Sequence, residues 1–194
     1  IVDADQVYCV SRCGHLFSTL DGGRSWRDYL LPEDVRDIYA GRVITLGVER
    51  VRLPNGSVAE LEIVRHPGPV VLIPVTASGE LLLVRQYRHP IGRWVWELPA
   101  GTPKPGEDIE HAALGECHEE TGTIPSRLDY IGAFYPSPGF CDEIMHFFKA
   151  TGLRTPGPGD DEAHQDEDED IESRAFGRDE LQRMIAAGEV IDLK

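Results

Sequence analysis

The stretch Gly101-Thr-Pro-Lys-Pro-Gly-Glu107, followed after seven residues by Gly115-Glu-Cys-His-Glu-Glu-Thr-Gly122, decides how the rest of this chain is interpreted. Wrapped on a helix with 3.6 residues per turn, Ile109, Ala112 and Ala113 fall on one face. Such an apolar stripe is the part of a surface helix that normally packs on a core. The sequence therefore predicts a helix over residues 107–121 with a defined buried side.

Three carboxylates continue the same stripe, those of Glu116, Glu119 and Glu120. Like charges three or four residues apart on a helix repel one another, and a buried carboxylate without a partner is costly. A hard divalent cation would remove both penalties, because Mg²⁺ and Ca²⁺ are bound by carboxylate oxygens. The alternative is a solvated acidic face, the ordinary setting for a run of glutamates, but the helical register favours the cation.

The segment resembles the Nudix box, the signature of hydrolases that cut nucleoside diphosphates linked to another group. The family pattern is G-x5-E-x7-R-E-U-x-E-E-x-G-U, where U is a bulky apolar residue. The positions that match at the right spacing are Gly101, Glu107, Glu116, Glu119, Glu120 and Gly122.

Three positions depart from that pattern. Gly115 stands where the family has arginine, and Cys117 and Thr123 stand where it prefers larger apolar residues. In the family the arginine helps to hold the box glutamates, which a glycine cannot do. Glycine inside a helix also costs about 1 kcal/mol relative to alanine. The departure at Gly115 bears on metal affinity and turnover more than on the fold.

The resemblance implies a set of metal ligands. They would hold Mg²⁺, or Mn²⁺, and they are the backbone carbonyl of Ala100 and the carboxylates of Glu116, Glu119 and Glu120. Gly101 and Gly106 permit the tight loop before the helix, and Gly122 suits the left-handed position that ends it.

The flanking residues resemble the ADP-ribose pyrophosphatase branch of the family, from about Tyr39 to Lys194. The segments that carry this resemblance are His66–Val70, Gln86–His89, Trp96–Gly101 and Ser137–Glu143. A proline about fifteen residues beyond the box marks the branch, and Pro138 stands there. The substrate-binding residues that we expect are Arg88, Glu97, Gly101 and Pro138. For Arg88 the reason is chemical, since a guanidinium engages phosphate oxygens in pairs, although a surface ion pair is the alternative.

The branch implies hydrolysis of ADP-ribose to AMP and ribose 5-phosphate. The bound metal ions would neutralise the diphosphate and activate a water. The proton would go to a box glutamate, Glu119 or Glu120, or to Glu167 or Glu169 in the acidic run before Glu172; a solvated linker is the other reading of that run. Two alternatives remain open: hydrolysis of another nucleoside diphosphate sugar, with GDP or UDP, and a catalytically weak domain that senses ADP-ribose or a nucleotide.

The expected fold class is α/β (α+β): the Nudix fold, a mixed β-sheet sandwiched between helices, with an N-terminal antiparallel sheet region. We divide the chain into three parts. Residues 1–38 form an appendage of unknown role, in which His15–Trp26 resembles an Asp-box but fits an ordinary hairpin better. Residues 39–65 form a β-hairpin sheet that the branch uses for dimerisation, and residues 66–194 form the catalytic domain.

Strands and one further helix are predicted from alternation, apolar runs and turn signals. Pro54-Asn-Gly56 is expected to join two strands as a hairpin. The expected strands are 43–53, 57–64, 70–75, 81–87, 94–99, 128–134, 143–150 and 171–176, and the expected helix is 179–187.

Composition excludes several classes of function. The formal net charge is −15 over 194 residues, which argues against a nucleic-acid backbone or an anionic membrane as partner. No apolar run is long enough to span a bilayer. The four cysteines are too scattered for a disulfide framework. Cys9, Cys13 and His15 could be half of a zinc site without a second half, so we expect reduced cysteines in a cytoplasmic protein. The resemblance to the branch implies a small-molecule nucleoside diphosphate substrate and a homodimer.

Overall fold

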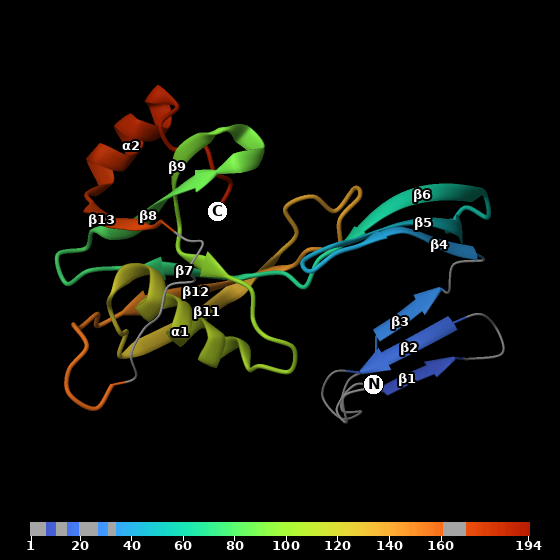
Figure 1. The fold of residues 1–194 in the computed structure, drawn as a ribbon, viewed down its shortest axis with the longest axis horizontal. Helices are drawn as coiled ribbons and strands as arrows, with labels where there is room; N and C mark the ends of the chain where they lie inside the picture. Colours follow the sequence, from blue (N-terminus) through green and yellow to red (C-terminus); the bar gives the residue numbers. More distant parts are fainter. Residues whose placement is uncertain (1–6, 11–14, 20–26, 31–33, 161–169) are drawn as a thin grey trace. The chain divides into compact units, whose positions relative to one another are not determined.

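The computed structural model describes residues 7–10, 15–19, 27–30, 34–160 and 170–194 (Figure 1), and of the first 37 residues only the backbone. The chain divides into two compact units. Unit 1 comprises residues 1–66 and 137–142, and unit 2 comprises residues 67–136 and 143–194. The predicted site residues, apart from Pro138, belong to unit 2.

Unit 1 is built from antiparallel strands. One sheet contains β1 (Val7–Val10), β2 (His15–Thr19) and β3 (Arg27–Leu30), and the other contains β4 (Asp34–Ala40), β5 (Thr45–Arg52) and β6 (Val58–Arg65). The β2–β3 pairing agrees with a hairpin in the region of the Asp-box resemblance, although residues 20–26 lie outside the described part.

The β5–β6 hairpin follows the sequence prediction closely. Gly56 has a φ of 86°, the left-handed region that glycine enters without strain, and the Asn55 side chain accepts a hydrogen bond from the backbone N–H of Ser57 at 3.0 Å. Segment 137–142 is tied to β6, because Val64 N–H donates to the Phe140 carbonyl and Asp142 pairs with Arg65 at 3.0 Å.

Unit 2 contains two sheets. The mixed sheet has the order β10-β7-β12-β11, in which β7 and β12 run parallel and the other pairs antiparallel. Its strands are β10 (Ala100–Gly101), β7 (Val70–Pro74), β12 (Met145–Thr151) and β11 (Arg127–Phe134). The antiparallel sheet has the order β13-β8-β9, with β13 (Glu172–Phe176), β8 (Leu81–Arg88) and β9 (Arg93–Glu97).

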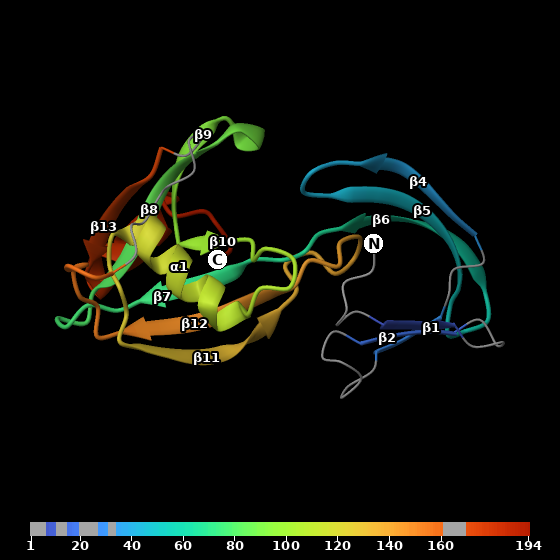
Figure 2. The ribbon, with the colours of Figure 1, turned by 60° about the horizontal axis from the view of Figure 1, so that its bottom comes forward.

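Helix α1 (Ile109–Thr121) packs on β7 and β12 (Figure 2), and a short 3-10 turn at His89–Ile91 and helix α2 (Arg178–Ala187) complete the unit. The core under α1 is almost fully buried; it consists of Val70, Leu72, Ala112, Ala113, Cys117, Phe148 and Ala150. The expected strands and helices lie within a few residues of their predicted positions, and the predicted fold class is confirmed. Strand β4 was not predicted; it pairs with β5 across residues assigned to the N-terminal appendage. Among the described residues no helix has the length and apolar character needed to cross a bilayer.

Candidate active site

Helix α1 begins two residues later than predicted, for a local reason. Asp108 caps the helix, since its carboxylate accepts hydrogen bonds from the N–H groups of Glu110 and His111. Glu107 instead closes the preceding loop, accepting the Lys104 N–H at 2.9 Å and lying 3.1 Å from His111 Nδ1. These contacts, with the Lys104 N–H first, lower the pKa of Glu107 below its ordinary value. The first box glutamate therefore shapes the loop that leads into the helix.

The box glutamates do not share one degree of burial. Glu120 is buried, Glu116 is half-buried and Glu119 is exposed, whereas the sequence placed all three on the buried side. The reason is a rotation of the helix: its buried stripe centres on Ala113 and Cys117. Glu119 is then roughly a third of a turn from that centre.

Cys117, a departure from the family pattern, behaves as an apolar core residue. It is 0% exposed, and burial raises the pKa of its thiol, which keeps it neutral. Its backbone carbonyl accepts a hydrogen bond from the Thr121 hydroxyl at 2.5 Å. A small, neutral thiol is thus sufficient where the family prefers a bulkier side chain.

Glu120 contacts the strand that precedes the box loop. Its Oε2 accepts the backbone N–H of Ala100 at 2.9 Å. The N–H of Leu72 donates to the carbonyl of the neighbouring Pro99 in the β7–β10 ladder, so the polar groups of Ala100 face away from β7. Because the N–H and C=O of one extended residue point to the same side, the Ala100 carbonyl also faces the Glu120 side.

Glu116 lies against the same strand. A Cβ built on Gly101 would meet Glu116 Oε1 at 1.9 Å and its carboxyl carbon at 2.0 Å, both impossible contacts. Only glycine can therefore stand at position 101 while the Glu116 carboxylate keeps its place. Two box carboxylates thus converge on the backbone of Ala100 and Gly101.

The donor set fits a hard cation in its chemistry: carboxylate oxygens on one helix facing a backbone carbonyl. The described residues contain no preformed cluster of three acidic, histidine or cysteine side chains of metal-binding geometry. Glu167 and Glu169, the predicted base or added ligand, lie outside the described residues. The ligand set Ala100, Glu116, Glu119 and Glu120 therefore remains a prediction.

Arg88 and Glu97 lie together on one face of the β8–β9 pair. Arg88 makes a two-pronged ion pair with Glu97, at 2.5 Å (Nη2–Oε1) and 3.3 Å (Nε–Oε2). The Glu97 side chain is 2% exposed and that of Arg88 is 40% exposed. The guanidinium is thus anchored on a buried carboxylate while part of it reaches solvent, which differs from the alternative of a simple surface pair.

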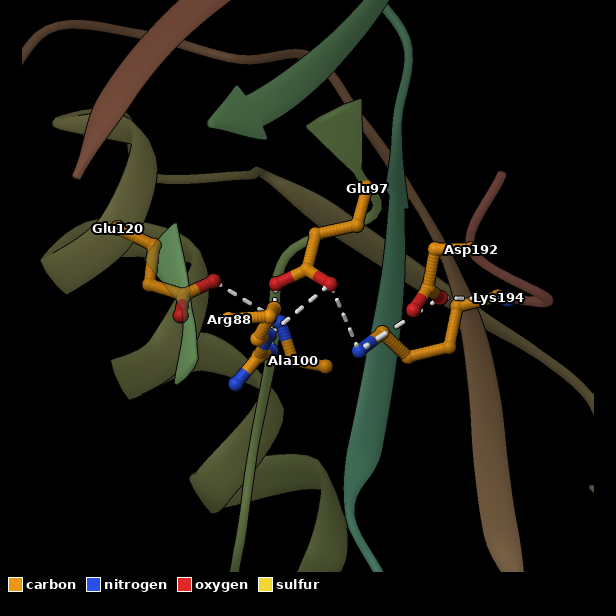
Figure 3. A network of polar contacts seen from close by, with 6 residues as sticks. All are labelled: Arg88, Glu97, Ala100, Glu120, Asp192 and Lys194. Atoms are coloured by element: carbon orange, nitrogen blue, oxygen red, sulfur yellow. Dashed lines mark hydrogen bonds and ion pairs between the residues drawn. The ribbon is translucent and has the colours of Figure 1, made fainter. Parts of the chain in front are cut away.

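A third member of this group was missed by the sequence reading. Lys194 Nζ lies 3.3 Å from Glu97 Oε2, and Asp192 accepts the backbone N–H of Lys194 at 2.8 Å (Figure 3). Ninety-seven residues separate Lys194 from Glu97, and no motif surrounds Lys194. No local signal could have joined them.

The aromatic side chains of β8 and β9 lie on the opposite face from Arg88 and Glu97, as alternation along a strand requires. Tyr87 and Trp94 contact each other edge to face at 5.8 Å between ring centroids, and Arg85 stacks over Trp94 at 5.1 Å. Trp96 packs on Phe176 at 4.8 Å. These rings therefore lie on the face of the sheet opposite the one on which Arg88 lies.

The remaining predicted residues are placed as follows. Pro138 is exposed and belongs to unit 1, so its role in substrate binding remains a prediction. At Gly115 a Cβ would meet nothing within 4 Å. The absence of the family's arginine is therefore not forced by lack of space.

The described residue that precedes the acidic run is firmly held. Asp160 makes two short ion-pair contacts with Arg154, at 2.6 and 2.7 Å, and accepts the Gly157 N–H at 2.7 Å. The Arg154 guanidinium, followed by that N–H, holds the pKa of Asp160 well below its usual range.

Comparisons with known proteins identify the family. The NUDIX domain model matches residues 65–192. An ADP-ribose pyrophosphatase of Bacillus subtilis (strain 168) is 42% identical over 157 residues, which cover 81% of this chain and 83% of that protein. The methanol dehydrogenase activator of Bacillus methanolicus is 40% identical, with the same shares of 81% and 83%.

A crystal structure of an ADP compounds hydrolase has the same fold, with a TM-score of 0.64 at 18% identity, covering 80% of this chain and 82% of that chain. The sequence resemblance to the Nudix box is thereby confirmed. Because the family model covers most of the chain and a relative above 40% identity covers four-fifths of it, this chain belongs to the Nudix family of hydrolases.

Proposed function

We propose that this chain is a metal-dependent hydrolase that cleaves the pyrophosphate of ADP-ribose to AMP and ribose 5-phosphate. The observation that carries the proposal is the convergence of Glu116 and Glu120 on the Ala100–Gly101 backbone. The name of the Bacillus subtilis relative, ADP-ribose pyrophosphatase, supports the choice of substrate.

The cation is Mg²⁺, with Mn²⁺ as a substitute, and Ala100, Glu116, Glu119 and Glu120 would hold it. When bound, it supplies charge neutralisation for the diphosphate and lowers the pKa of a water. Without such help a chain of net charge −15 would repel an anionic substrate.

The chain's own residues bind and orient the substrate. Arg88 engages the diphosphate oxygens, and Gly101 lets the Glu116 carboxylate lie against the loop. A water attacks one phosphorus, the bridging P–O bond breaks, and the proton of the water passes to a carboxylate. The candidates for that base are Glu119, Glu120, Glu167 and Glu169.

We further propose that the chain works as a cytoplasmic homodimer whose sheet β4–β5–β6 forms the contact. Exposed apolar side chains on this sheet and at its turns support this, because such a surface needs covering. They are Ile38, Tyr39, Val43, Ile44, Val58 and Leu61. The two cysteines whose side chains are described, Cys117 and Cys141, are free thiols, as expected in a reducing compartment.

The test is hydrolysis, with product identification, of ADP-ribose, GDP-mannose, UDP-glucose, diadenosine polyphosphates and NADH, in Mg²⁺, in Mn²⁺ and in excess chelator. We expect AMP to appear fastest from ADP-ribose and the reaction to stop in chelator. If a GDP- or UDP-sugar is cleaved fastest, that sugar nucleotide and not ADP-ribose is the substrate. Tight binding of ADP-ribose with no turnover of any compound would favour the alternative that the chain senses ADP-ribose instead of cleaving it.

A further inference from the structure

The buried carboxylate of Glu97 forms ion pairs with two cationic side chains rather than one. Arg88 occupies both of its oxygens, and Lys194 Nζ approaches Oε2 at 3.3 Å. Asp192 balances the extra charge, since its Oδ1 lies 3.7 Å from Lys194 Nζ. The four side chains carry two positive and two negative charges, so the network is neutral as a whole.

The two cations differ in where they lie. The Arg88 side chain is 40% exposed, whereas that of Lys194 is 14% exposed. Asp192 also accepts the backbone N–H of Lys194 at 2.8 Å, which fixes the turn that directs the ammonium at Glu97 (Figure 3). Arg88 is thus the cation that can reach a ligand, and Lys194 is the cation that remains paired with Glu97.

This difference matters when a phosphate arrives. A guanidinium that turns toward phosphate weakens its bond to a carboxylate, and a buried carboxylate that loses its only cation is strongly unfavourable. With one counter-ion, phosphate binding would have to work against that penalty. With two, Glu97 stays compensated whether or not Arg88 is engaged elsewhere.

We propose that Lys194 is a positioning residue that keeps Glu97 compensated while Arg88 turns from Glu97 to the diphosphate of the substrate. The proposal rests on the proposed function for the identity of the ligand, a nucleoside diphosphate. Lys194 itself touches neither the substrate nor the reacting atoms.

The test compares kcat and KM for ADP-ribose in the wild type and in K194M, K194R, E97Q/K194M and the control K149M, which alters an exposed lysine on β12. We expect K194M to raise KM by about tenfold with kcat within about twofold of wild type. K194R restores the charge and should restore KM, and K149M should match wild type.

The double variant separates positioning from simple damage. In K194M, Arg88 is held on Glu97; replacing Glu97 by glutamine releases it, so E97Q/K194M should have a lower KM than K194M. A KM as high as in K194M would show that release of Arg88 from Glu97 does not restore binding and would overturn the proposal, as would wild-type constants in K194M. If K194M does not fold, the KM values of E97Q/K194M and K194R are compared with that of wild type. Neither of these variants leaves a buried charge without a partner.

Failure of the proposed function is separately visible. A wild type that does not cleave ADP-ribose contradicts that function alone, and calorimetric Kd values for ADP then replace KM with the same variants. A weaker Kd in K194M, relieved by adding E97Q, supports the role of Lys194; equal Kd values in wild type and K194M reject it.

Discussion

The central strand of unit 2 and the hairpin of unit 1 handle apolar side chains in opposite ways. In β7, Val70, Val71 and Leu72 are all 0% exposed, as expected for a strand covered on both faces. In β6, Val58 is 40% and Leu61 is 37% exposed. Unit 2, which carries the proposed site chemistry, thus covers this strand completely, whereas the hairpin of unit 1 leaves apolar surface for another partner to cover.

The test with the largest expected effect removes the charge of the proposed metal-binding glutamates in unit 2 without altering its apolar core. E120Q keeps the shape and the hydrogen bond from Ala100 but loses the charge, and E119Q loses the charge of an exposed carboxylate. We expect turnover of ADP-ribose to fall by about 100-fold or more in E120Q and substantially in E119Q, with little change in Tm.

E110Q is the matched control, because Glu110 is an exposed residue of the same helix; it should retain wild-type turnover. Near-normal activity in both E119Q and E120Q would remove the cation site from α1. The contrast between unit 2 as the unit with the active site and unit 1 as the unit with the dimer contact would then be contradicted.

A second pair of variants sharpens the account of the site itself. In G101A the new Cβ would displace the Glu116 carboxylate, which is the mobile end of a flexible side chain, so turnover should fall by about tenfold or more while Tm changes little. G115A meets open space and gains helix propensity worth up to about 1 kcal/mol, so Tm should rise. Activity and calorimetry measure both; equal, mild effects at the two glycines would contradict the close approach of Glu116.

The third test addresses unit 1. Val58 and Leu61 lie on opposite faces of β6, so the double variant V58D/L61D places a carboxylate on each face of the sheet. It should shift the protein from dimer to monomer whichever face forms the proposed contact. Light scattering after size exclusion measures the mass. I185D is the control, since Ile185 is 59% exposed on α2 of unit 2; a dimer that survives V58D/L61D but dissociates in I185D would reverse the roles of the units.

The smallest effect concerns acid stability at the start of the acidic run. The folded pKa of Asp160 is depressed by Arg154, so its contribution to stability is present above its unfolded pKa of about 3.9 and is lost as pH falls below that. D160N should lower Tm slightly at pH 7, on the order of 1 °C, because the pair is exposed. The two melting curves should converge below about pH 4, and a difference that persists unchanged at pH 2 would rule out the ionised pair as the cause.

Local patterns predicted the elements because their causes are local. The Pro54-Asn55-Gly56 turn forms a hairpin through backbone conformation alone, and the spacing of Ile109, Ala112 and Ala113 was enough to predict α1. The rotation of α1 depends instead on how Cys117 packs on β7 and β12. That rotation exposes Glu119, which spacing alone could not foresee.

The ion pairs around Glu97 lie beyond local reasoning for a different reason. Resemblance predicted Arg88 and Glu97 as site residues, yet their mutual contact depends on strand pairing, and that of Lys194 depends on the return of the chain after α2. Nothing near Lys194 in the sequence distinguishes it from a surface lysine.

Gly115 has a consequence for the history of this enzyme and for its engineering. A Cβ at position 115 would meet nothing within 4 Å, and a single-base change converts a glycine codon into an arginine codon, so the family's arginine could be regained in one mutation. That step would restore the arginine, and Cys117 and Thr123 would still depart from the box pattern. Selection in the laboratory for faster turnover should find that step early, and a lineage that never takes it has settled on a box that works with glycine.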